Sequence, residues 1–234
     1  MELSNRFSLV DFLAYLFPGI LTTLGIYLLL LLTPLMHVMQ GVSLDTGTGL
    51  LFLALSYIVG IITSGFAEIA FRERHAAGIK EALCLDGFQR ELIKAFDMLL
   101  AISPDVKPEW SVSHFYVCRS LVFEYMPNVG QIVQRQISLR QLRMNMIPSI
   151  LIWLVDAVLW GAVYAFNVQP LWGIVLIIGS IVLSIATITV LLNRMNDNEK
   201  REVRETLTAF LAGCKTGVFE NLKVEDHKYF IAQS

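Results

Sequence analysis

Apolar residues along this chain are gathered in long blocks instead of alternating with polar ones, a pattern that argues against strands and favours helices. Four blocks are nearly free of charged residues. At about 1.5 Å per residue, each block can cross roughly 30 Å of hydrocarbon. The blocks are residues 12–33, 49–67, 146–166 and 171–192. The pattern predicts an all-α polytopic membrane protein with four transmembrane helices.

The polar segments between and after these blocks divide the chain into four parts. These are a first transmembrane hairpin (1–71), a helical insert (72–143), a second transmembrane hairpin (144–193) and a helical tail (194–234). Pro127 is expected to break or bend the last helix of the insert. The insert is too small to fold well alone. We therefore expect it to pack on itself, on neighbouring subunits and on the tail, whose charged helix becomes apolar near Phe210.

The placement of basic residues predicts the topology. Charged residues make up only 16% of the 234 residues, against about 25% in a typical soluble domain. No Lys or Arg occurs in residues 34–48 or 167–170, whereas the connection between spans two and three and the tail contain many. By the positive-inside rule, both termini, the insert and the tail are expected in the cytoplasm.

Span one is expected to be a true span, because its apolar run is too long for the core of a signal peptide and no small-residue cleavage site follows it. Ser8 and Asp11 fit a capping box at its start. Pro18 lacks a backbone N–H, so it should bend the helix and leave a carbonyl for a neighbouring helix to satisfy.

Span two carries a stripe of small residues that ends in an acid: Ser56, Gly60, Ser64 and Glu68, at successive four-residue intervals. These residues share one helix face. Small residues let helices approach closely in a membrane, so the stripe is predicted to be a packing face. Glu68 stands four residues before Arg72, the favourable order for an ion pair at the cytoplasmic end of the span.

One carboxylate, Asp156, interrupts span three. It follows the boundary residue Arg143 by thirteen positions, which places it about 20 Å along the helix, near the bilayer midplane. An ionised carboxylate there costs about 2.5–3.5 kcal/mol on insertion scales. Trp153, Trp160 and Tyr164 fall on the same helix face as Asp156.

This intramembrane polar face has two interpretations. In the first, copies of span three line a central path in a homo-oligomer, with a ring of carboxylates that is cation-selective or proton-sensitive. In the second, Asp156 is protonated and joins two helices through hydrogen bonds to Ser, Thr or Trp. In span four, Ser180, Ser184 and Thr187 could line a pore, but helix packing is the favoured interpretation.

Basic residues flank the second hairpin on both sides. They are Arg135, Arg140 and Arg143 before span three, and Arg194, Lys200, Arg201 and Arg204 after span four. Such clusters beside a membrane most often bind anionic lipid headgroups. A phosphate-rich ligand, nucleotide or nucleic acid is the disfavoured alternative, because Glu199, Glu202 and Glu205 dilute the positive field.

The sequence gives no indication of catalysis, of a cofactor or of a metal site. It has no phosphate-binding glycine loop, HExxH motif or nucleophile elbow. His114 and Cys118 are four residues apart but lack a third, orienting group. Cys84, Cys118 and Cys214 have no CxxC spacing and lie in segments predicted to be cytoplasmic, so neither disulfides nor structural zinc is expected.

The segment DFLAYLFPG opens span one, and CRSLVFEYMP precedes RQISLRQLR ahead of span three. With the helical insert between spans two and three, this layout resembles the small four-span membrane proteins of bacterial anti-phage and CRISPR-accessory systems, such as the membrane subunit of Kiwa. The resemblance implies a homo-oligomeric membrane component, coupled to a soluble partner or second messenger, that senses or perturbs the inner membrane during infection. It assigns no functional residue.

The sequence therefore predicts a non-enzymatic, oligomeric protein of the lipid bilayer that acts through its cytoplasmic helices. The first hypothesis is an ion-conducting or membrane-perturbing effector. The alternative is a non-conducting sensor or scaffold that recruits a soluble partner protein. A solute carrier is disfavoured, because the spans show neither an inverted repeat nor paired broken helices.

Overall fold

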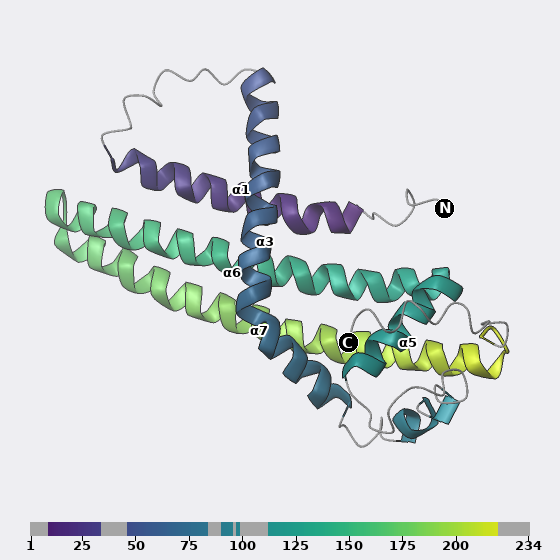
Figure 1. Ribbon diagram of the computed structural model, residues 1–234. Helices are drawn as coiled ribbons and strands as arrows, with labels where there is room; N and C mark the ends of the chain where they lie inside the picture. The colour runs from purple at the N-terminus through teal and green to yellow at the C-terminus, as the bar shows by residue number, and fades with distance from the viewer. Residues whose placement is uncertain (1–8, 34–45, 84–89, 96, 99–111, 220–234) are drawn as a thin grey trace. The chain divides into compact units, whose positions relative to one another are not determined.

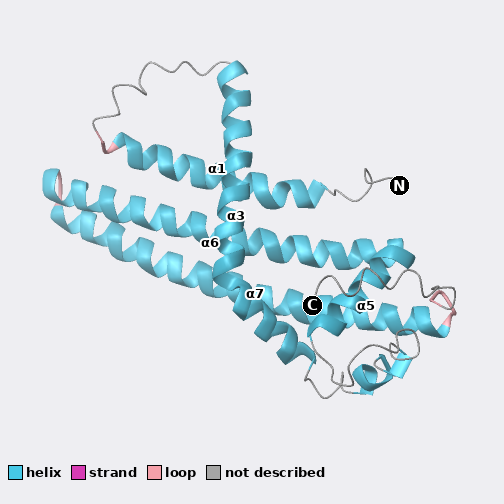
Figure 2. Ribbon diagram, in the orientation of Figure 1, coloured by secondary structure: helices cyan, strands magenta, loops and turns pink. Residues whose placement is uncertain are grey.

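The protein is helical, apart from short turns, in the ranges that the computed structural model describes, which are residues 9–33, 46–83, 90–95, 97–98 and 112–219. The named helices are α1 (Leu9–Leu31), α3 (Thr46–Leu83), α5 (Val112–Tyr125), α6 (Pro127–Asn167) and α7 (Pro170–Lys215) (Figure 1). No strand occurs in these ranges (Figure 2). The predicted all-α class is confirmed for this part of the chain.

Four of the described helices, α1, α3, α6 and α7, are long and apolar enough to cross a membrane. They contain the predicted apolar blocks, except that α1 ends two residues before the end of the first block. With 38, 41 and 46 residues, α3, α6 and α7 exceed the roughly 20 residues that a crossing requires. Pro127 separates α5 from α6, as expected. It occupies the first position of α6, where its missing N–H has no helical partner to lose.

The chain forms two compact units. The span unit comprises residues 1–71 and 138–195, and the helical unit comprises residues 72–137 and 196–234, each with the gaps stated above. Both apolar hairpins thus belong to one unit. Most of the insert and of the tail belongs to the other.

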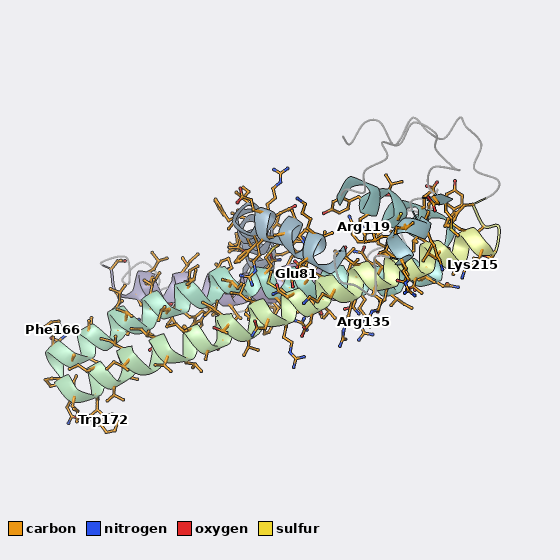
Figure 3. The ribbon with its side chains drawn as sticks, turned by 90° about the horizontal axis from the view of Figure 1, so that it is seen from below. Glu81, Arg119, Arg135, Phe166, Trp172 and Lys215 are labelled. Atoms are coloured by element: carbon orange, nitrogen blue, oxygen red, sulfur yellow. The ribbon has the colours of Figure 1, made fainter. Side chains whose placement is uncertain are left out.

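The span unit has a small buried cluster and a largely apolar surface. Ala67, Met144, Ile147 and Met195 form the cluster, whereas only 6% of the apolar segment of α7 is buried. At the turn between α6 and α7, Phe166 and Trp172 lie at the exposed end of the hairpin (Figure 3). Such an apolar surface suits contact with a lipid bilayer, and aromatic residues are enriched where spans meet the interface.

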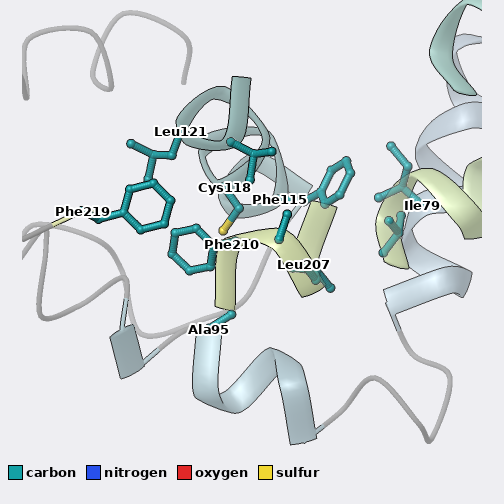
Figure 4. Close-up of a cluster of buried hydrophobic side chains, with 11 residues drawn as sticks. Ile79, Ala95, Phe115, Cys118, Leu121, Leu207, Phe210 and Phe219 are labelled. Carbon is teal, nitrogen blue, oxygen red and sulfur yellow. The ribbon is translucent and has the colours of Figure 1, made fainter. Parts of the chain in front are cut away.

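The helical unit has the larger core (Figure 4). Its residues come from α3, α5 and α7 and from Ala95 and Phe219. Those drawn and labelled are Ile79, Ala95, Phe115, Cys118, Leu121, Leu207, Phe210 and Phe219. Phe115 and Phe210 are fully buried. The expectation that the tail docks back on the insert near Phe210 is therefore confirmed.

The C-terminal end of α7 is closed by a glycine turn. Gly217 has a φ of 71°, and the Val218 amide donates to the Gly213 carbonyl over 3.0 Å. Only glycine adopts such a φ without strain, and a helix commonly ends at such a residue. The turn brings Phe219 back over α7, where its ring stacks on Phe210 with centroids 5.4 Å apart.

Gly213→Ala is expected to destabilise the protein by about 1–3 kcal/mol, because the added β-carbon would meet the Phe219 ring. Thermal unfolding in detergent, followed by circular dichroism, measures the effect. Gly179→Ala in the same helix is the control. A β-carbon at Gly179 meets nothing within 4 Å, so this variant should be neutral or slightly more stable. Equal stability of both variants would contradict the packing of Phe219 on Gly213.

Candidate intramembrane polar site

Polar side chains of α6 donate hydrogen bonds to the backbone of α1, within the span unit. Asn145 Nδ2 donates to the Ala14 carbonyl over 3.0 Å, and Trp153 Nε1 donates to the Leu21 carbonyl over 2.9 Å. Between them, Ser149 Oγ donates to the Pro18 carbonyl over 3.1 Å. The donors are four residues apart, so they form one row along α6.

The row follows from the proline in α1. Pro18 has no N–H, so the carbonyl of Ala14, four residues earlier, has no helical donor. In hydrocarbon an unsatisfied carbonyl is costly, and the fully buried Asn145 supplies the missing donor. This confirms the expectation that a neighbouring helix satisfies the carbonyl that Pro18 leaves.

Asp156 lies about one turn beyond Trp153 on α6. Its side chain is 3% exposed, and neither carboxyl oxygen has a hydrogen-bond partner among the described residues. The neighbouring residue of α1 is Gly25. A β-carbon at Gly25 would lie 2.6 Å from the Ile152 side chain and 3.2 Å from Asp156 Oδ2. The absence of a side chain at Gly25 therefore allows α1 to cover the acid.

The four residues of the predicted polar face do not share one surface. Asp156 is buried, whereas the side chains of Trp153, Trp160 and Tyr164 are 39–41% exposed. Trp160 and Tyr164 instead line a groove of about 440 Å³ between α6 and α7, and Asp156 is not among the residues that line it. The structure thus places the acid and the Trp153 indole N–H against α1, and the other two rings beside α7.

The small-residue stripe of α3 packs for most of its length. Ser56, Gly60 and Ser64 are buried, whereas Glu68 is exposed. A β-carbon at Gly60 would collide with the Tyr15 carbonyl of α1, which shows how closely the two backbones approach. Glu68 and Arg72 are both described, and no ion pair joins them, so that expectation is wrong. Both side chains lie exposed to solvent, where such a pair contributes little.

Hydroxyl groups in the span of α7 bond to their own helix. Ser180 donates to the Leu176 carbonyl, and Thr187 Oγ1 donates to the Leu183 carbonyl over 2.8 Å. Ser184 is half-buried. The hydrogen bonds of Ser180 and Thr187 are thus satisfied without a pore or a second helix.

The basic residues proposed to bind headgroups are distributed over both units. Arg140, Arg143 and Arg194 belong to the span unit, where Arg143 Nη1 donates to the Arg194 carbonyl over 2.7 Å. Arg135, Arg201 and Arg204 belong to the helical unit and are exposed. Arg143 therefore has a structural role at the packing of α6 on α7, in addition to any contact with lipid.

Two acids that the sequence placed among surface charges are buried in the helical unit. Glu202 Oε1 lies 2.8 Å from Arg119 Nη1, and Glu199 Oε1 lies 3.0 Å from His75 Nδ1. Glu199 and Glu202 are 1% and 0% exposed. Glu202 is thus paired with a cation inside the helical unit instead of being a free surface charge beside the neighbouring arginines. Both glutamates share a helix face with Val203 and Leu207, and this spacing is the sequence signal that could have predicted their burial.

Tyr116 of α5 links the Arg119–Glu202 pair to the His75–Glu199 contact. Its hydroxyl lies 3.5 Å from His75 Nε2, and the Arg119 guanidinium stands 4.6 Å from the centre of its ring, which is cation–π geometry. Nearby on α7, burial raises the pKa of the Glu205 carboxyl, and Arg201 offsets part of that rise. These contacts hold α3, α5 and α7 together within the helical unit.

The two described cysteines are free thiols in the core of the helical unit. Burial raises the pKa of Cys118 strongly and that of Cys214 to about 11, so both are neutral thiols at physiological pH. Among the described residues, no group of three His, Cys, Asp or Glu side chains could hold a metal ion. Other predictions rested on four side chains that the structure does not describe, those of Ser8, Asp11, Cys84 and His114.

Comparison of the chain with protein-family models, with curated proteins and with solved structures finds no match.

Proposed function

We propose that the protein is a multi-pass scaffold or sensor of a bacterial inner membrane, which recruits a soluble partner protein through its cytoplasmic helices. The observation that carries the proposal is that polar side chains of α6 in the span unit form hydrogen bonds within the chain. Asn145, Ser149 and Trp153 all donate to α1 of the same chain. Because these three donors bond within the chain, their row on α6 is not available to line a conducting path.

The helical unit supports the recruiting role. It has its own core and two buried glutamates, one paired with Arg119 and one in contact with His75, so it presents a defined surface instead of a loose linker. Buried ion pairs add little net stability, but in some proteins they specify one arrangement of helices. With the termini, insert and tail in the cytoplasm, as the basic residues predict, this surface faces the cytoplasm.

The second candidate function is the ion-conducting effector. It is favoured by Asp156, whose two oxygens have no partner among the described residues. In a homo-oligomer that brings several copies of α6 together, a rotation of α6 away from α1 would turn these carboxyls toward a central path. An intramembrane acid is by default a candidate for such a role.

A membrane-potential assay separates the two functions. We expect cells that express the wild-type protein or Asp156→Asn to keep the same potential, measured with a voltage-sensitive dye, both before and after infection. Phe166→Leu, at the exposed end of the hairpin, is a control for expression and insertion. Depolarisation by the wild type that Asp156→Asn abolishes would reject the scaffold in favour of the conducting effector.

A further inference from the structure

Among the residues that the structure describes, the surroundings of Asp156 contain no group that could balance a negative charge. No Lys, Arg or His occurs in residues 9–33, 46–67 or 144–192, which form the spans and their immediate ends. The titratable groups of the helices in these ranges, apart from Asp11 at the start of α1, are tyrosines: Tyr15 and Tyr27 in α1, Tyr57 in α3 and Tyr164 in α6. None of these supplies a positive charge.

The acid is also closed off from water. Asp156 is 3% exposed, and Gly25 lies against its Oδ2 side. A carboxylate that is buried without a counter-ion or a hydrogen-bond donor is strongly disfavoured relative to the neutral acid. The ligand that this geometry fits is a single proton.

We propose that Asp156 is a proton-binding site covered by α1. While α1 lies against α6, the carboxyl keeps its proton. When α1 withdraws and water enters, the O–H bond breaks, its electron pair stays on the carboxylate oxygen, and the proton passes to water. A movement of α1 thereby produces one negative charge inside the span unit. This inference does not depend on whether the protein conducts ions or recruits a partner.

The charge state of Asp156 can be read directly by infrared spectroscopy of the full chain in detergent or vesicles at neutral pH. A neutral carboxylic acid has a carbonyl-stretch band that an ionised carboxylate lacks. The spectrum of the wild type minus that of Asp156→Asn should show this band. A difference that contains only ionised-carboxylate bands would overturn the proposal.

A second measurement needs no variant. Wild-type protein made with aspartate labelled with ¹³C at the side-chain carboxyl should show an isotope shift of the neutral-acid band. Aspartates in contact with water are ionised at neutral pH, and buried glutamates such as Glu199 are not labelled. Absence of the shift would overturn the proposal even if Asp156→Asn failed to fold.

The role of α1 as the cover is tested at Gly25. Gly25→Leu should push α1 away, because even its first side-chain carbon would meet Ile152 and Asp156. We expect this variant to lose most of the neutral-acid band at neutral pH and to regain it on acidification. Gly65→Leu is the matched control in the same unit, because a β-carbon at Gly65 meets nothing within 4 Å. A full band in Gly25→Leu would show that α1 is not the cover.

Discussion

Arg119→Met is expected to lower the stability of the helical unit by about 3 kcal/mol, because it removes the positive charge that pairs with the buried Glu202 carboxylate. Glu202 is 1% exposed at its side chain, whereas Arg119 is 23% exposed. The partial contact of Arg119 with solvent places the effect at the lower end of the range for broken buried pairs. Thermal unfolding in detergent, followed by circular dichroism, measures the loss.

Two further variants separate charge from packing. The double variant Arg119→Met/Glu202→Leu removes both charges and should recover most of the lost stability, because apolar residues of similar size often replace a buried pair without loss. Lys200→Met breaks the exposed pair between Lys200 and Glu81, 3.4 Å apart, and should change stability by less than about 1 kcal/mol. If Arg119→Met were as mild as Lys200→Met, Glu202 would not depend on Arg119 for its burial.

Asn145→Leu is expected to lower the stability of the span unit by about 1–2 kcal/mol. The substitution keeps the size of the side chain but removes the donor to the Ala14 carbonyl. That carbonyl then has no partner in an apolar environment, because Pro18 cannot supply one. Double-mutant cycles in a membrane protein give an average of about 0.6 kcal/mol for an interhelical hydrogen bond. The loss expected here is larger because it also includes the cost of leaving the Ala14 carbonyl without a donor. Unfolding in mixed detergents at increasing denaturant fraction measures it.

The matched variant is Pro18→Ala, which returns a backbone N–H to position 18. In the Asn145→Leu background it should recover the lost stability, since α1 can then satisfy its own carbonyl. In the wild-type background it should gain much less, because Asn145 already bonds the Ala14 carbonyl. Equal effects of Pro18→Ala in both backgrounds would contradict the link between Pro18 and Asn145.

The long-range pattern of the chain was predictable because it depends on local composition. The four apolar helices, the break at Pro127 and the docking of Phe210 follow from hydrophobic runs and helical spacing. Pro18 even predicted that a neighbouring helix would supply a donor. The identity of that donor, Asn145, could not be predicted, because it is 127 positions along the chain and no local pattern connects the two.

The candidate site shows the same limit. Asp156, Trp153, Trp160 and Tyr164 share a helix face by spacing, but a face of about half a helix can contact two neighbours at once. The position of α1 turns Asp156 inward, and the position of α7 gives Trp160 and Tyr164 their groove. A spacing argument identifies candidate residues on one side of a helix, and the packing partners decide their separate environments.

By itself, then, the sequence determined that the described part of the chain is helical, with four helices apolar enough to cross a membrane, because hydrocarbon compatibility is a property of consecutive residues. Only the tertiary structure decided which polar groups are satisfied. Glu199 and Glu202 read as surface charges along the chain, yet α3 and α5 bury and pair them. Asp156 is buried too, but neither of its carboxyl oxygens has a partner among the described residues. The physical reason is that the environment of a charged side chain is set by groups distant in sequence.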